Sequence, residues 1–447
     1  MIAVAQPFVA VRNRLRMFAH LAVGAYLLGN LAIIHLLFLS VTPAHNVFGQ
    51  VGRLLGLYLA FMMTVQVLLV ARLPLLDRAF GMDRLTGWHR WTGFTVFWLA
   101  VLHPSFVVLG FARYDRVPVL TTAAALSRQV PVLLGMIAVG LIVVIAGLSV
   151  RIARRRLSYE TWHAVHLLLY VVLILGIIHQ VYEGTAFTIN LVTRIYWWGL
   201  WTAALGALLT GRLIVPLIRN RRHRLRVAAV VPESDDVVSV HVTGRDLDRL
   251  QARAGQFFLW RFPGHHRWWQ VNPFSLSAAP NDRSLRLTAK AVGTTSAGLR
   301  DLPIGARVFA EGPYGAFTLA TRTCRPTLLI AGGIGVTPIR SLLEDPALGS
   351  DTIVIYRVRR GADAVLLGEI RNLTTRRGAR LHVITGRTGP GNQPFHPPNL
   401  LRMVPDITTR DVYVCGPHAL TSAVLAALRK LKVPSRQVHA ELFRLAG

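Results

Sequence analysis

Long apolar stretches dominate the first half of the chain, whereas the second half alternates between short apolar and polar runs. Six stretches before residue 218 reach the roughly 20 apolar residues that a helix needs to cross the hydrocarbon core of a bilayer. The pattern therefore predicts an α-helical membrane bundle. Its six transmembrane helices are expected at approximately residues 17–41, 52–71, 88–111, 130–150, 161–181 and 191–218.

After about Arg222 the pattern changes to short strands separated by turn residues, as in a small antiparallel β-barrel. From Thr327 a strand runs into a glycine-rich loop and then a helix, which predicts an α/β domain. We therefore expect four regions. They are a cytoplasmic N-terminus (1–16), the transmembrane domain (17–218), an antiparallel β-barrel domain (219–322) and an α/β domain (323–447).

The formal net charge of +29 comes largely from arginines beside the apolar stretches, so we expect lipid contact and no nucleic-acid partner. The first apolar run is too long for a cleavable signal peptide and predicts a transmembrane helix. Cys324 and Cys415 form no disulfide framework. By the positive-inside rule, both termini are cytoplasmic in a multi-pass cell-membrane protein. The flanks assigned outside carry only Arg53, Arg113, Arg116, Arg128 and Arg194.

Two of the apolar stretches carry histidines at matched spacings. His89 and His103 lie fourteen residues apart, and His166 and His179 lie thirteen apart. At about 1.5 Å rise per residue, either spacing separates two side chains by roughly 20 Å along a helix. Ionisable residues inside a membrane span mark a functional site by default. Two facing helices would thus offer an inner and an outer His–His pair, the axial ligands of two haems.

Other interpretations of these histidines remain open. His163 competes with His166, although its distance from His179 of about 24 Å along a helix matches the other helix less well. Four structural histidines are a second possibility. Zinc would need ligands closer together. No CxxCH motif occurs, so the haems would be of b type. Thirteen residues do not restore the helical face, so the helix must tilt or the haems must be offset.

The second half contains loops with the composition of nucleotide-binding sites. Glycines in residues 331–338 let the backbone approach a pyrophosphate at a helix N-terminus. The strand 352–359 ends in Arg357 and Arg359, which suit a ribose 2′-phosphate. Further motifs are NPFSLS (272–277), KAVGTTSAGL (290–299), EGPYGAF (311–317) and VYVCGPH (412–418).

On these motifs the second half resembles the ferredoxin–NADP reductase superfamily, and the whole chain resembles the ferric reductase and NADPH oxidase family. The resemblance implies that FAD and NADPH bind here, with Ser275, Cys415 and Phe443 beside the reacting rings. The implied FAD residues are Phe274, Ser275, Ser277, Lys290, Gly293, Thr294, Thr295 and Phe443. The implied nucleotide residues are Gly333, Gly335, Thr337, Pro338, Arg357, Arg359, Cys415, Gly416 and Pro417.

The chain departs from the family pattern at two positions. Asn272 stands where members commonly have His or Arg, and Val107 stands where oxidases often have a second His after the outer ligand. Phe97 and Trp98 lie between the two haem levels, where they either bridge the haems or pack against neighbouring helices.

The expected function is electron transfer from cytoplasmic NADPH through FAD and two b haems to an extracytoplasmic acceptor. Oxygen giving superoxide is the favoured acceptor, and Arg53 either supplies a positive field for superoxide or anchors its helix at the interface. A ferric chelate is the close alternative. A haem subunit serving a separate extracytoplasmic enzyme and a proton-conducting module are further alternatives, and the attached dehydrogenase argues against both.

Overall fold

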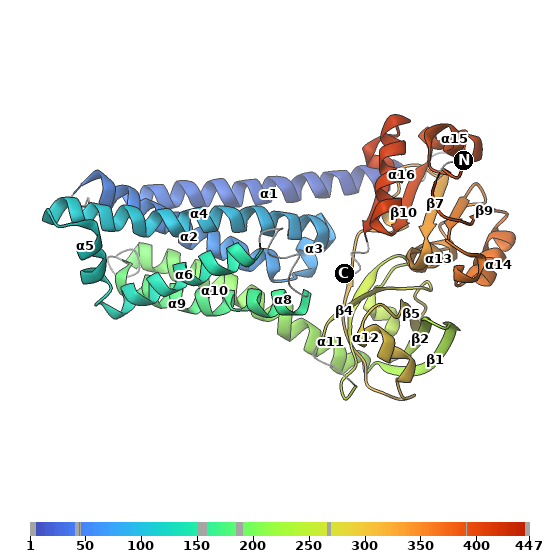
Figure 1. Cartoon of the computed structure of the whole chain (residues 1–447), viewed down its shortest axis with the longest axis horizontal. Helices are drawn as coiled ribbons and strands as arrows, with labels where there is room; N and C mark the ends of the chain where they lie inside the picture. The colour runs from blue at the N-terminus through green and yellow to red at the C-terminus, as the bar shows by residue number, and fades with distance from the viewer. Residues whose placement is uncertain are drawn as a thin grey trace. The chain divides into compact units, whose positions relative to one another are not determined.

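A computed structural model describes residues 6–40, 44, 46–149, 159–184, 191–265, 270–389 and 391–442 of the chain (Figure 1). The chain divides into two compact units between Ile214 and Val215. The N-terminal unit is helical, whereas the C-terminal unit contains every strand of the described residues. We call them the membrane unit and the nucleotide unit, and describe each by itself.

Six helical stretches are long and apolar enough to cross a membrane, as the sequence predicts. They are Met17–Leu39, Val47–Val70, Arg84–Asp115, Val130–Ser149, Thr161–Glu183 and Leu191–His223. The helices of the membrane unit are α1 (Gln6–Leu39), α2 (Val47–Val70), α3 (Pro74–Phe80), α4 (Met82–Asp115), α5 (Val119–Leu126), α6 (Val130–Ser149), α8 (Tyr159–Leu167), α9 (Leu169–Glu183) and α10 (Leu191–Leu209). A π-helical turn (Thr210–Ile214) follows α10, and α11 (Val215–His223) begins the nucleotide unit.

Helix α2 packs along α4, and α6 packs along α9 (Figure 1). Glycines allow the close approach of α2 and α4, because a Cβ at Gly52 would lie 2.8 Å from Val107 Cγ2, and one at Gly110 would lie 2.8 Å from Gly49 N. Asn46 caps α2 and also donates its side-chain amide to Gly110 O at 2.7 Å. A buried apolar cluster of Ala100, Ala138, Ile142 and Val172 joins α4, α6 and α9.

The fifth span is interrupted at Leu168, between α8 and α9. There Leu168 N donates to Val165 O at 3.1 Å, and Val171 N donates to Leu168 O at 2.9 Å. Hydrogen bonds between residues i and i+3, as in a 3₁₀-helix, wind the chain more tightly than those of an α-helix. This overwinding turns His179 further around the helix relative to His166, which is the direction that their thirteen-residue spacing requires. The sequence predicted tilt or offset and did not reveal this break.

The first half of the nucleotide unit contains two three-stranded antiparallel sheets. One has the order β1 (Arg226–Ser234), β2 (Val237–Thr243), β5 (Ser284–Lys290), and the other has the order β4 (Asn272–Ser275), β3 (Phe257–Arg261), β6 (Phe309–Tyr314). Isolated bridges link Arg226 to Arg307 and Leu276 to Leu287. Val240, Phe258, Trp260 and Leu287 share one buried core. The described strands thus form two open sheets, and the closed barrel stays a prediction.

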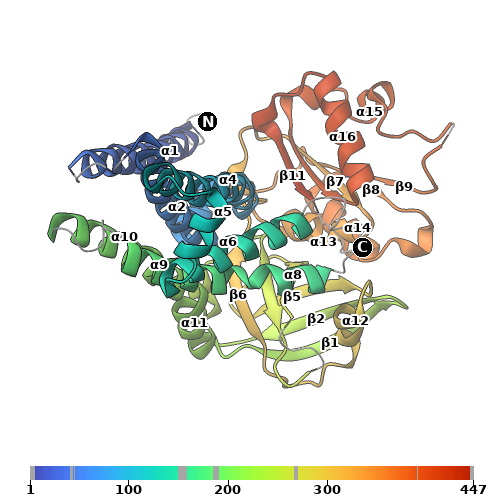
Figure 2. The ribbon, with the colours of Figure 1, turned by 60° about the vertical axis from the view of Figure 1, so that its left-hand side comes forward.

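The second half is a fully parallel five-stranded sheet, in agreement with the predicted α/β pattern. Its order is β11 (Val438–Leu442), β10 (Asp411–Gly416), β7 (Thr327–Gly332), β8 (Ile353–Arg357), β9 (Arg380–Ile384). Buried residues of α13 (Val336–Glu344) and α14 (Leu367–Arg377) join one core, and those of α15 (Pro397–Met403) and α16 (His418–Lys430) join another (Figure 2). Because the strand order reverses beside β7, a crevice is expected at the carboxyl ends of β7 and β10.

Candidate functional site

The structure brings the four predicted histidines of the membrane unit together as two pairs. His89 on α4 faces His166 on α8, with ring centroids 6.2 Å apart. His103 on α4 faces His179 on α9, with ring centroids 6.3 Å apart. His163 is exposed, whereas His166 is half-buried against Trp162, whose ring stacks on it at 5.1 Å. The geometry therefore favours His166 over His163 as the partner of His89.

Both pairs fit a metal held between two imidazoles. Two such rings bound on opposite sides of one metal, at about 2 Å per bond, have ring centres roughly 6 Å apart. Among the described residues, no group of three or more His, Cys, Asp or Glu side chains could hold a metal ion. Each pair thus supplies two ligands only, which suits an iron whose other four ligands come from a porphyrin. A protein-only zinc site does not fit the described residues.

The predicted flavin segment lies on β4, where Phe274 and Ser275 pair with Phe258 and Phe257 of β3. Trp260 Nε1 donates to Phe274 O at 3.1 Å, which fixes the backbone of this segment. The Ser275 side chain is 2% exposed, and its hydroxyl has no hydrogen-bond partner among the described residues. A buried hydroxyl in that state is available to a ligand atom.

Ser277 and Lys290 are committed to other contacts. The buried Ser277 hydroxyl accepts hydrogen bonds from Thr288 Oγ1 at 2.7 Å and from Arg286 Nε at 3.1 Å. Lys290 Nζ lies 2.9 Å from Asp236 Oδ2 at the surface, and this hydrogen bond holds the pKa of the Asp236 carboxyl below its usual value. Both side chains therefore have protein partners that hold them in place, whether or not they also contact the flavin.

The predicted phosphate loop begins at Gly293 and enters the short helix α12 (Thr294–Ala297). Ser296 Oγ accepts hydrogen bonds from Val292 N and Gly293 N, both at 3.0 Å. No heavy atom lies within 4 Å of where a Gly293 Cβ would be, so the loop is open on that side. Ser296 therefore holds the backbone at the start of this loop. The side chains of Thr294 and Thr295 lie outside the described part of the chain.

The nucleotide loop lies at the switch point of the parallel sheet. Gly333 has a positive φ of 52°, and a Cβ at Gly335 would lie 2.4 Å from Cys415 O. Glycine is required at Gly335 because the ends of β7 and β10 meet there. Gly416 is also in close contact, since its Cβ would lie 3.0 Å from Gly332 Cα. Within α13 Thr337 donates to Ile334 O at 3.1 Å, Pro338 is buried beside it, and Pro417 precedes α16.

Burial raises the pKa of the Cys415 thiol well above its usual value, and the nearby Glu441 acts in the same direction. This side chain is fully buried at the end of β10, so it remains a neutral thiol at physiological pH. Phe443, which was predicted beside the flavin, lies outside the described residues, directly after β11.

Arg357 and Arg359 occupy unequal positions. Arg357 is 6% exposed, and its Nη1 donates to Thr385 O at 2.8 Å. Its Nη2 is buried with no partner among the described residues, and desolvation lowers the pKa of the guanidinium. Arg359 is exposed, and its carbonyl accepts a hydrogen bond from Gly386 N at 2.9 Å. Arg357 therefore holds the loop after β9, whereas the Arg359 side chain can reach a ligand.

Sequence patterns missed a charged cluster that joins the two halves of the nucleotide unit. We call it the Arg286 cluster, and its members are Arg286, Arg340, Glu344 and Glu369. Arg286 of β5 and Arg340 of α13 are both nearly buried and bind Glu369 of α14 at 2.9 and 2.7 Å. Glu344 pairs with Arg340 and accepts a hydrogen bond from Ala279 N at 2.7 Å. No local motif predicts this cluster, because Arg286, Arg340 and Glu369 lie far apart in the sequence.

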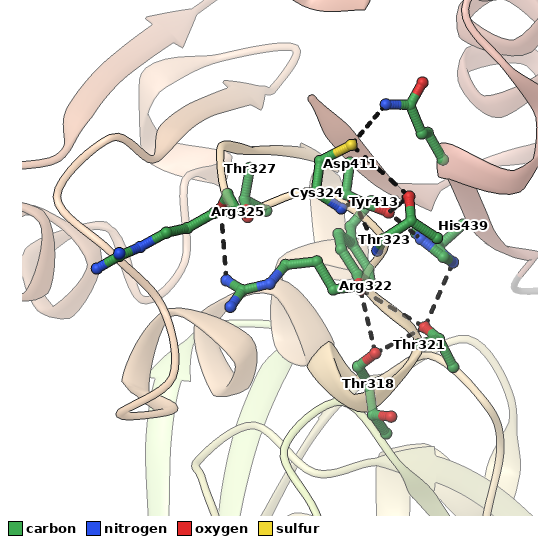
Figure 3. A network of polar contacts seen from close by, with 11 residues as sticks. Thr318, Thr321, Arg322, Thr323, Cys324, Arg325, Thr327, Asp411, Tyr413 and His439 are labelled. Atoms are coloured by element: carbon green, nitrogen blue, oxygen red, sulfur yellow. Dashed lines mark hydrogen bonds and ion pairs between the residues drawn. The ribbon is translucent and has the colours of Figure 1, made fainter. Parts of the chain in front are cut away.

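A second network ties the connection between the two halves to the parallel sheet (Figure 3). The carboxylate of Asp411 is fully buried and accepts hydrogen bonds from Thr323 N, Thr323 Oγ1, Cys324 N and His439 Nε2. The ring of His439 stacks on Tyr413 with centroids 4.4 Å apart. Four donors satisfy the carboxylate, so this network stabilises the fold.

Comparison with known proteins agrees with this arrangement. Residues 55–177 match a family described as the ferric reductase like transmembrane component. Residues 221–318 match an FAD-binding domain, and residues 329–425 match an oxidoreductase NAD-binding domain. By class, the chain is a membrane oxidoreductase with FAD- and NAD-binding domains. The three matches, in this order, make up the ferric reductase and NADPH oxidase-like architecture.

The chain is 31% identical over 234 residues to the ferredoxin reductase component of 3-ketosteroid-9-alpha-monooxygenase from Mycobacterium tuberculosis. That match covers 49% of this chain and 65% of the relative. A 29% match over 238 residues, to the reductase component of propane 2-monooxygenase from Mycolicibacterium goodii, covers 49% and 67%. The FAD/NAD-binding domain of a Vibrio cholerae nitric oxide dioxygenase is similar at 20% identity with a TM-score of 0.40, covering 50% of this chain and 98% of that domain.

Proposed function

We propose that this protein carries electrons across a membrane, from NADPH through FAD and two b haems to an acceptor on the opposite side. The observation that carries the proposal is the presence of two facing histidine pairs in a membrane unit whose chain continues into FAD- and NAD-binding domains. His89 and His166 would hold the inner haem, and His103 and His179 the outer one. Bound haem would supply one-electron redox chemistry at each pair.

The nucleotide unit would act by binding and orientation. Bound FAD would supply the conversion of a two-electron donor into single electrons. The Ser275 hydroxyl would donate to the flavin from β4, and Cys415 and Gly416 would border the nicotinamide from the end of β10. Gly335 keeps the nucleotide loop close to that end of β10. Arg359 would favour NADPH over NADH by pairing with the 2′-phosphate.

Domain limits and orientation belong to the same proposal. We place the FAD domain, as an antiparallel β-barrel, at 219–322 and the NADPH domain at 323–447. The limits are supported by the division of compact units at Ile214 and by the two family matches. Arginine-rich flanks put both termini in the cytoplasm.

For the acceptor, we favour oxygen, reduced by outer-sphere transfer to superoxide. A ferric chelate is the second candidate, and the position of Val107 favours it. A Cβ at Gly52 would lie 2.8 Å from Val107 Cγ2, so Val107 packs between α2 and α4 and brings no polar group to the outer pair. The relatives are named as reductase components of monooxygenases, so donation to a separate enzyme is a third candidate.

The test is NADPH consumption by the purified protein in air, under argon, and under argon with ferric citrate. Turnover in air with superoxide formation supports the oxidase. Turnover with ferric citrate but not in air would overturn it in favour of the reductase. Failure under all three conditions, with the flavin reduced by NADPH, would point to a protein acceptor.

A further inference from the structure

The two histidine pairs differ in what their second ring nitrogens contact. In the outer pair, His103 Nδ1 lies 2.8 Å from Gly52 O, and His179 Nδ1 lies 2.9 Å from Pro131 O. A carbonyl oxygen can only accept, so each Nδ1 carries the hydrogen and donates it. The lone pair of each ring is then on Nε2, the nitrogen left to bind a metal.

Each of these two carbonyls is accessible to the ring because a glycine lies four residues further along the same helix. A Cβ at Gly56 would lie 2.8 Å from His103 Nδ1, and a Cβ at Gly135 would lie 2.9 Å from His179 Nδ1. In a helix the Cβ of residue i+4 leans toward the N-terminus, over the carbonyl of residue i. Without that Cβ, a ring from a neighbouring helix can reach the carbonyl. The arrangement occurs twice, on α2 and on α6, and we call these two glycines the ring seats.

Within the part of the chain that the structure describes, the inner pair has no such acceptors. His89 Nδ1 and His166 Nδ1 are buried and have no hydrogen-bond partner among the described residues. His166 instead stacks on Trp162 with an interplanar angle of 23°, and Trp162 Nε1 donates to Ser149 Oγ at 3.1 Å. The inner rings are therefore held by packing, whereas the outer rings are held by hydrogen bonds.

This difference has a chemical consequence for a metal bound to each pair. A histidine that donates its second N–H to an acceptor becomes a more basic ligand, and hydrogen bonding around a haem tunes its reduction potential. A more basic ligand stabilises the oxidised iron, because that state carries the greater positive charge. Resting on the haem sites proposed above, we infer that Gly56 and Gly135 are positioning residues that give the outer haem a lower reduction potential than the inner haem.

At equilibrium an electron would then reside mainly on the inner haem. The outer haem, which faces the acceptor, would be the stronger one-electron reductant. A tenfold difference in electron sharing between the two sites corresponds to about 59 mV for a one-electron couple. We expect a difference of at least that order, because both outer ligands donate a hydrogen bond and neither inner ligand does so to any of the described residues.

Potentiometric titration of single-haem proteins tests the order directly. His89→Leu combined with His166→Leu leaves the outer pair, and His103→Leu combined with His179→Leu leaves the inner pair. The outer-pair protein should titrate at the lower potential. Equal potentials, or the reverse order, would overturn the inference while leaving the proposed function intact. A wild-type protein that binds no haem would instead refute the proposed function.

The ring seats provide a second test in the two-haem protein. Gly56→Ala or Gly135→Ala should raise the potential of the outer haem or release it, and should leave the potential of the inner haem unchanged. Gly140→Ala is the matched control on α6, because no heavy atom lies within 4 Å of its Cβ position. Alanine favours a helix by about 1 kcal/mol over glycine, so helix weakening does not explain a loss. An unaltered outer haem in both seat variants would contradict the assignment.

Discussion

The membrane unit and the nucleotide unit build their candidate sites from opposite materials. In the membrane unit, four imidazoles on α4, α8 and α9 form the two candidate ligand pairs among the described residues, and helix packing sets their spacing. In the nucleotide unit, the nucleotide loop depends on backbone approach at Gly335, and charged clusters hold the surrounding strands. Placing a polar side chain in a bilayer costs free energy, whereas exposing it to water does not. A polar residue is therefore strong evidence of function in the first unit and weak evidence in the second.

The strongest challenge to this comparison is removal of one outer ligand. His179→Ala should abolish the outer haem and lower acceptor reduction by roughly a hundredfold or more, because a six-coordinate haem needs both axial bonds. Reduction of FAD by NADPH should continue at the wild-type rate, since it depends on the nucleotide unit. Haem content by absorbance and flavin reduction by stopped flow measure the two effects. Two intact haems in this variant would show that His179 is structural.

The corresponding test in the nucleotide unit removes Glu369 from the Arg286 cluster. Glu369→Ala leaves Arg286 and Arg340 nearly buried without their shared carboxylate, which should lower the free energy of unfolding by about 2–3 kcal/mol after allowance for partial exposure. Thermal unfolding monitored by flavin release measures the loss. Asp363→Ala, which breaks the exposed pair with Arg360, is the control and should change little. Equal unfolding temperatures for the two variants would show that the Arg286 cluster does not stabilise the fold.

The same carboxylate predicts a dependence on pH. Burial alone would raise the pKa of Glu369, but hydrogen bonds and charges of Arg286 and Arg340 outweigh it and hold the pKa below 4.5. The unfolded state therefore binds this proton more readily, so its contribution to stability is present above pH 4.5 and is lost as pH falls through the lowered pKa. Wild-type protein should lose more stability than Glu369→Gln on acidification below pH 4.5. Parallel unfolding curves would contradict this origin.

A smaller effect separates Arg357, the last residue of β8, from Arg359, which follows the strand. Arg359→Ala should lower the use of NADPH roughly tenfold and leave NADH almost unchanged, because a charge-assisted bond contributes about 1.5–3 kcal/mol. Arg357→Ala should lower the use of both nucleotides, because Arg357 holds the loop at Thr385. Steady-state kcat/KM for each nucleotide decides, with Arg360→Ala as a neighbouring control. Equal losses for both nucleotides in Arg359→Ala would refute its phosphate role.

The smallest predicted effect tests whether every polar contact in the membrane matters equally. Tyr196 on α10 donates its hydroxyl to Asn30 Oδ1 of α1 at 2.8 Å. Such hydrogen bonds between membrane helices contribute on average about 0.6 kcal/mol, so Tyr196→Phe should lower the thermal midpoint only slightly. The exposed Tyr170 on α9 provides the control variant, Tyr170→Phe. A loss of haem in Tyr196→Phe would mean that this contact supports the site itself.

The membrane unit and the nucleotide unit also differ in how much of their structure could be predicted from the sequence. Six spans and the His spacings were readable because apolar runs are long and their histidines few. The break at Leu168 and the ring seats were not readable, since they depend on how neighbouring helices meet. In the nucleotide unit the glycine loops were visible as motifs. The burial of Arg357 and the pairing of Arg286 with Glu369 were not, because their partners lie 28 and 83 residues away.

The central claim is that electrons cross the membrane through the two histidine pairs. Its most direct test uses purified protein in sealed vesicles, with ferricyanide trapped inside and NADPH added outside. Only molecules whose nucleotide unit faces outward can use this NADPH. We predict that the trapped ferricyanide is reduced by the wild-type protein and not by His179→Ala. Reduction of external ferricyanide alone, with the trapped pool unchanged in the wild type, would contradict the account.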